Sequence, residues 1–115
     1  MDVNESDYFR QTALFYACKN DRLEIVKILI EHGANVNHKD IVSNTPLFYA
    51  AKEGHTRIVK FLLSNHADVN IFGENKKTAL YYAKMNKNNE IINILIEKGA
   101  INTKDGKLTQ NDIKK

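Results

Sequence analysis

The chain has 115 residues, of which 43% are hydrophobic and 27% are charged, and its formal net charge is +3. This composition predicts one folded domain and excludes disorder for most of the chain. Because the basic residues are spread along the sequence, neither a nucleic acid nor a membrane surface is implied as a partner.

A repeat of 33 residues organises the chain. The phrase Thr-Ala-Leu-Phe-Tyr-Ala that begins at Thr12 returns in closely similar form at Thr45 and again at Thr78. Pairs of aliphatic residues follow in the same phase, beginning at Ile25, Ile58 and Ile91. This period is typical of stacked repeat proteins, in which one unit is too small to bury its own apolar residues and relies on its neighbours.

The first part of each unit predicts a short helix. A threonine precedes each of these helices, and its hydroxyl can cap the helix by accepting a hydrogen bond from a free backbone N–H. Pro46 follows one of the threonines, at a position where its missing N–H costs nothing. We expect these first helices to end near Lys19, Lys52 and Met85.

The second part of each unit predicts another helix, because its apolar residues recur at i, i+1, i+4 and i+5 while polar residues such as Glu24 and Lys27 take the opposite face. Gly33 and Gly99 suit a left-handed residue just after the helix end. His66 replaces this glycine in the middle unit, where a side chain should cost roughly 1 kcal/mol.

These periods divide one domain, residues 1–115, into parts. Three repeats occupy residues 12–44, 45–77 and 78–110, and residues 111–115 form a tail. Residues 1–11 match the end of a repeat, so they are either the end of a preceding repeat in a longer protein or a reduced N-terminal cap. Thr109 and Asp112 are spaced as in a capping box, which predicts the start of a short helix.

Residues 45–70 resemble the consensus of the ankyrin repeat, which reads Thr-Pro-Leu-His, then Gly-His, Ile-Val and finally Gly-Ala-Asp-Val-Asn. The matching residues here are Thr45-Pro-Leu-Phe48, Gly54-His55, Ile58-Val59 and Ala67-Asp-Val-Asn70. The resemblance covers residues 2–103 in unbroken register. It implies an all-α fold, an ankyrin-repeat solenoid of stacked helix–turn–helix units with hairpin-like fingers between them.

Two of the departures from the ankyrin consensus affect how the repeats pack. The histidine of the first phrase is replaced by Phe15, Phe48 and Tyr81, so its hydrogen-bonding role is lost and aromatic packing should take its place. In the third unit the small residue expected between stacked repeats is Lys84. A long cation does not fit a tight contact between repeats, so we expect the third unit to cap the stack with a polar outer face.

No catalytic constellation, cofactor motif or metal-ligand spacing occurs, so the chain is predicted not to be an enzyme and to need no cofactor or metal. Cys18, the single cysteine, stands at a small buried position of its repeat and predicts a structural thiol. Neither a signal peptide nor an apolar stretch long enough to span a bilayer is present. We expect a cytoplasmic protein, in the host cytosol if the source is an intracellular pathogen.

The resemblance further implies a protein partner that contacts the fingers and the concave groove formed by the first helices. On the groove the predicted contact residues are Tyr16, Lys19, Tyr49, Lys52, Tyr82 and Met85. On the fingers they are Phe9, Arg10, Ile41, Val42, Phe72 and Lys76. Two alternatives remain: the tyrosines shield the helices, and the apolar finger residues pack against each other.

The predicted function is therefore protein–protein interaction by a monomer, with a partner that presents acidic and apolar side chains. A second hypothesis is that the chain is the docking or targeting segment of a larger enzyme, channel or effector. Nucleic-acid binding is a weaker third hypothesis, because it depends only on the modest positive charge.

Overall fold

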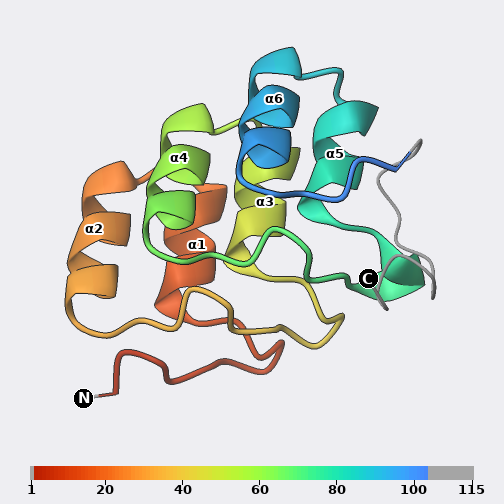
Figure 1. Cartoon of the computed structure of the whole chain (residues 1–115). Helices are drawn as coiled ribbons and strands as arrows, with labels where there is room; N and C mark the ends of the chain where they lie inside the picture. Colours follow the sequence, from red (N-terminus) through yellow and green to blue (C-terminus); the bar gives the residue numbers. More distant parts are fainter. Residues whose placement is uncertain (1, 104–115) are drawn as a thin grey trace.

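The computed structural model describes residues 2–103, so the capping box predicted at Thr109 lies outside the described residues. Helices and short loops make up the described part, which contains no β-strand (Figure 1). Its elements are α1 (Ala13–Lys19), α2 (Leu23–Glu31), α3 (Pro46–Lys52), α4 (Thr56–Ser64), the one-turn 3-10 helix η1 (Glu74–Lys76), α5 (Ala79–Met85) and α6 (Asn89–Glu97). The three first helices end at the residues that the sequence predicted.

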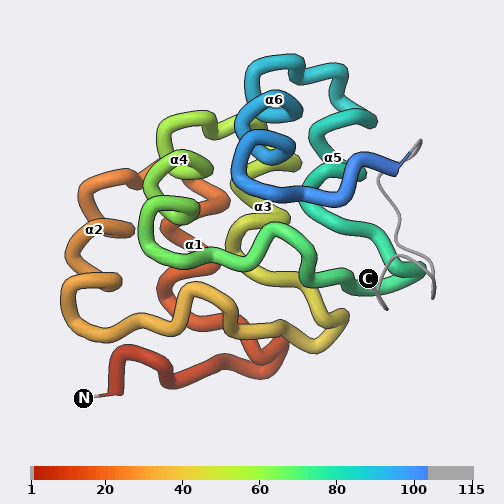
Figure 2. The backbone as a smooth tube through the Cα atoms, viewed as in Figure 1, coloured from red at the N-terminus to blue at the C-terminus, as the bar shows by residue number. Residues whose placement is uncertain are grey.

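The helices form two parallel rows. Helices α1, α3 and α5 make the inner row, α2, α4 and α6 make the outer row, and the long loops that join successive pairs extend from one end of the helices (Figures 1 and 2). Each pair packs against the next, which gives an elongated body of 41 × 25 × 22 Å. The prediction of an all-α stack with hairpin-like fingers is confirmed.

Burial in the stack depends on having a neighbouring pair on each side. Ile58 and Ile91 begin the apolar stripes of α4 and α6, and both are fully buried. Ile25 holds the same position in α2, but it is 49% exposed because no helix pair lies before it in the described residues. Removing such a side chain from water contributes about 1.5–3 kcal/mol, so the stacking contacts supply much of the stability.

The helix starts differ from the prediction in one respect. No threonine side chain caps its helix. The carbonyl of Thr12 accepts the N–H of Phe15 at 3.0 Å, and the carbonyl of Thr45 accepts that of Phe48 at 3.0 Å. Those N–H groups are the donors that a capping hydroxyl would have used, so the predicted cap is wrong.

The ends of the outer helices follow one hydrogen-bonding pattern, the Schellman motif. After α2, the N–H of Ala34 donates to Leu29 O at 2.9 Å and that of Gly33, with φ +91°, donates to Ile30 O at 3.0 Å. His66 follows α4 with φ +73°, and its N–H to Leu63 O distance is longer, at 3.4 Å. A side chain is thus held in the left-handed region, as predicted.

Asparagine side chains join each unit to the next. Asn37 donates through Nδ2 to His66 O at 3.1 Å, and its Oδ1 accepts the N–H of Asp68 at 2.8 Å. Asn70 makes the same two bonds one unit further on, and Asn4 makes them one unit earlier. Residues 2–11 are therefore hydrogen-bonded in register with the repeats that follow.

The strain at His66 predicts a stabilising substitution. Replacing His66 with Gly should raise the free energy of unfolding by about 1 kcal/mol, because glycine adopts a positive φ without a Cβ clash. Urea denaturation followed by circular dichroism measures the change. Gly33→His is the matched control and should lower stability by a similar amount. Equal stability of wild type and His66→Gly would show that the left-handed backbone at this position is not strained.

Candidate protein-binding surface

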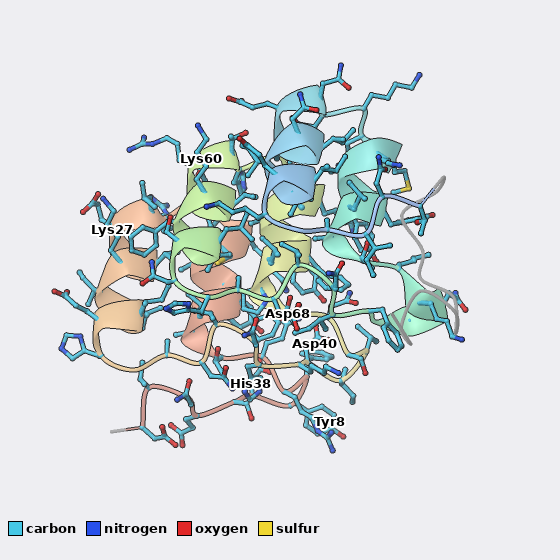
Figure 3. All side chains as sticks on the ribbon, in the orientation of Figure 1. Tyr8, Lys27, His38, Asp40, Lys60 and Asp68 are labelled. Atoms are coloured by element: carbon cyan, nitrogen blue, oxygen red, sulfur yellow. The ribbon has the colours of Figure 1, made fainter. Side chains whose placement is uncertain are left out.

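The first two fingers expose a cluster of large apolar side chains, here called the finger patch. Its members are Tyr8, Phe9, Ile41 and Val42, which are 91%, 58%, 56% and 41% exposed. The two fingers lie side by side, since the Ile41 N–H donates to Phe9 O at 2.9 Å. Figure 3 shows Tyr8 at the far end of the first finger. Packing between the fingers leaves these side chains in solvent, and exposed apolar clusters of this kind mark interaction surfaces.

The other predicted finger residues differ from the finger patch. Arg10 is exposed at the first turn, with φ +60°. Phe72 is only partly buried at the base of the third finger, and the residues beyond it, Glu74–Lys76, form the polar helix η1. Lys76 is exposed there. The row of fingers is therefore apolar in its first two members and charged in its third.

Tyr16, Tyr49 and Tyr82 occupy the same position in α1, α3 and α5 and are here called the tyrosine ladder. Tyr16 is 42% exposed, and the other two are partly buried. The Tyr49 hydroxyl donates to Asp40 Oδ2 at 2.5 Å, and the Tyr16 hydroxyl donates to Asp7 in the same way. The first two tyrosines are thus held by carboxylates of this chain, a contact that was not predicted from the sequence.

Asp40 is almost completely buried, yet four donors satisfy its carboxylate. One oxygen accepts the N–H groups of Val42 and Asn44 at 3.1 and 2.9 Å. The other accepts the Tyr49 hydroxyl and, at 2.9 Å, Nε2 of Gln11. Four hydrogen bonds compensate for the cost of removing this charge from water, so Asp40 ties the second finger to α3.

Lysines lie over the rings of the ladder. Lys19 Nζ is 5.0 Å from the ring centre of Tyr16 and 4.6 Å from that of Tyr49, and it donates to Gln11 Oε1 at 2.6 Å. Lys52 is exposed, with Nζ 6.0 Å from the ring centre of Tyr82. Met85, the last predicted ladder neighbour, is 55% exposed. The structure thus places the aromatic and cationic residues of the prediction along one face of the inner helices.

The aromatic substitutions of the repeat lie beneath this face. Phe15 and Phe48 are essentially fully buried. The Phe15 ring meets the Tyr49 ring edge-on at 5.9 Å, and the Phe48 ring lies 5.9 Å from that of Tyr82. These contacts support the ladder from below, as expected where aromatic residues replace histidine.

The N-terminal end of the stack carries a surface that was not predicted from the sequence. A hollow of about 690 Å³ lies between residues 2–5 and α2, and its walls include Val3, Ala13, Ile28 and Leu29. Ile28 is 53% exposed. The signal was available in the repeat itself, because stripe residues of the first unit have no earlier helix pair to cover them.

Polar side chains that could carry chemistry, such as His55 and Lys84, form hydrogen bonds within the fold. Within residues 2–103, no three histidine, cysteine, aspartate or glutamate side chains gather to hold a metal ion. His55 Nε2 lies 3.0 Å from Lys19 O and so joins the first two units. Lys84 is partly buried, and its ammonium donates to Asn102 Oδ1 and Thr103 O. The longest described helices have nine residues, fewer than the ~20 that a bilayer crossing requires.

Cys18 is fully buried, and burial raises the pKa of its thiol from 9.0 to about 12. A thiol reagent should therefore modify native protein about a thousandfold more slowly than denatured protein, because the reaction waits for unfolding. Absorbance of the released chromophore measures both rates. In a Cys18→Ala background, Ser64→Cys supplies an exposed control thiol that should react rapidly in the native state. Fast native modification of Cys18 would disprove its burial.

The Tyr49 hydroxyl predicts a loss of stability in alkali. Burial, and then the hydrogen bond to Asp40, raise its pKa from 10.0 to about 12. Since the folded pKa exceeds the unfolded one, this stabilisation is complete below pH 10 and is lost as pH rises to 12. The stability difference between wild type and Tyr49→Phe should shrink across this range in urea denaturation. Tyr8→Phe, at an exposed tyrosine, is the control; a difference independent of pH would contradict the assignment.

The comparison with known families agrees with the geometry. The family model described as ankyrin repeats in three copies matches residues 1–72 and 41–105, which together span most of the chain. No curated protein matches the sequence. Repeats of this kind are generally protein-interaction modules and are typically non-catalytic. The chain, with its 33-residue period and its two rows of helices, belongs to the ankyrin repeat family.

Proposed function

We propose that the chain binds a protein partner through the finger patch and the tyrosine ladder, and that it catalyses no reaction. The observation that carries this proposal is the finger patch, where four large apolar side chains on two adjacent turns are 41–91% exposed. Keeping such side chains in water has no benefit for the isolated fold. Burial against a partner would remove them from water, at about 25 cal/mol per Å².

The tyrosine ladder supports the same proposal. Tyrosine offers a large, rigid contact area with few rotatable bonds, and such residues are enriched where binding energy concentrates. Lys19 and Lys52 border the rings, and the chain has a net charge of +3. The partner that fits best presents apolar and acidic side chains. In this proposal the domain is a cytoplasmic monomer. As an alternative, the chain is the docking or targeting segment of a larger enzyme, channel or effector.

The test compares two sets of substitutions in capture experiments from a lysate of the source organism. The Phe9→Ser, Ile41→Thr, Val42→Thr variant should lose a retained partner, with affinity at least about tenfold weaker. Substitutions at the fingers are a better test than alanine substitutions in the ladder. Truncating Tyr49 would leave the buried carboxylate of Asp40 without one of its hydrogen-bond donors. Mass spectrometry identifies the partner, and titration of the purified pair gives the affinity.

Ile25→Thr with Ile28→Thr is the matched control, since it also removes exposed apolar surface, but at the N-terminal end of the stack. Circular dichroism first shows that both variants fold. A partner retained by the control and lost by the finger variant supports the proposal. A partner lost only by the control would move the binding surface to the N-terminal end.

A further inference from the structure

The tyrosine ladder contains one position that lacks the carboxylate found at the other two. Residues 7, 40 and 73 are spaced by 33 and begin the three fingers. All three fingers close with the same pair of backbone bonds. In the second, Asp40 N–H donates to Asn44 O and Ser43 N–H donates to Asp40 O, both at 2.9 Å. In the third, the bonds from Gly73 to Lys77 and from Lys76 to Gly73 measure 2.9 and 3.0 Å.

The side chain at this position decides what the ladder tyrosine binds. Asp7 and Asp40 accept the hydroxyls of Tyr16 and Tyr49. Gly73 has no side chain, and no residue among 2–103 forms a hydrogen bond with the hydroxyl of Tyr82, which remains partly exposed. A phenol hydroxyl at a protein surface retains its capacity to donate a hydrogen bond to an acid.

The charges around the third position are also unbalanced. At the first two positions, Lys19 lies over both tyrosine rings, and the two hydroxyls donate to aspartates of this chain. At the third position, Lys52 Nζ lies 6.0 Å from the Tyr82 ring and Lys77 Nζ lies 5.0 Å from the Tyr81 ring, while the two rings are 5.3 Å apart. Neither lysine forms an ion pair within the described residues, although Glu74 stands nearby in the third finger.

We propose that an aspartate or glutamate side chain of the protein partner binds at this third position, where it accepts the Tyr82 hydroxyl and lies beside Lys52 and Lys77. It supplies the carboxylate that Gly73 lacks. The same partner segment places apolar side chains on the finger patch, so its apolar and acidic ends have a fixed order along the stack. This inference rests on the proposed function and assigns its acidic contact to one repeat.

Position 73 does not readily accept an acidic side chain. A Cβ on Gly73 would lie 2.2 Å from Asn44 Oδ1, so an aspartate there requires Asn44 to move. Asn44 is 8% exposed, and its Oδ1 has no hydrogen-bond partner among the described residues. The double variant Gly73→Asp with Asn44→Ala gives the new side chain room and would place an internal carboxylate beside Tyr82.

The test selects peptides from a random phage-displayed library against the full chain. The enriched peptides should contain an acidic residue next to apolar ones. Changing that acid to its amide should weaken binding to wild type about tenfold, as expected for a charge-assisted hydrogen bond. The same change should have little effect on binding to Tyr82→Phe with Lys52→Gln, or to Gly73→Asp with Asn44→Ala. Lys60→Gln, at an exposed lysine of the outer helix α4, is the control and should retain the wild-type preference for the acid.

The outcomes separate this inference from the proposed function. Enriched peptides that compete for the finger patch but contain no acid would overturn the inference alone. An acid whose loss weakens binding equally in wild type and in the Tyr82→Phe, Lys52→Gln variant would also overturn it. Failure to enrich any peptide would count against the proposed function as well. Urea denaturation of each variant excludes unfolding as the cause of a lost preference.

Discussion

Ile58 and Ile91 are fully buried because the helices of the preceding repeat lie against them, whereas Ile25, at the same position of the first repeat, is 49% exposed. The other features of the molecule depend on this contact between neighbouring pairs, because one pair of seven- and nine-residue helices is too small to enclose a core. The aromatic residues Phe15 and Phe48 and the small residue Cys18 are buried in the stack for the same reason.

Because the contacts between stacked helix pairs supply much of the stability, the side chains at the finger tips do not need to contribute to it. Their backbones are held by the side chain that begins each of the first two turns and by asparagine bonds between units, such as that from Asn37 to His66. These bonds use the backbone of the tip residues but none of their side chains. Apolar residues such as Ile41 and Val42 can therefore stand in solvent without loss of structure, which is what a binding surface requires.

The tyrosine ladder combines support and recognition. Its first two hydroxyls are bound by Asp7 and Asp40, so these tyrosines connect a finger to an inner helix and also present their rings to solvent. The two alternatives posed by the sequence, shielding and contact, thus apply to the same side chains. Within residues 2–103, Tyr82 is the ladder tyrosine whose hydroxyl has no acceptor, and the lysines around it give the surface a different charge. All three ladder residues are tyrosine, but their hydroxyl groups differ in their hydrogen-bond partners.

The sequence alone predicts the period, the ends of the inner helices at Lys19, Lys52 and Met85, and the left-handed residue at His66, because these features depend on local periodicity and backbone sterics. The finger and ladder residues could also be located by their phase. The missing cap at Thr12 and the hydrogen bond from Tyr49 to Asp40 are visible only in the folded chain. Burial and hydrogen-bond partners depend on which side chains neighbouring repeats bring together, and spacing within one repeat does not contain that information.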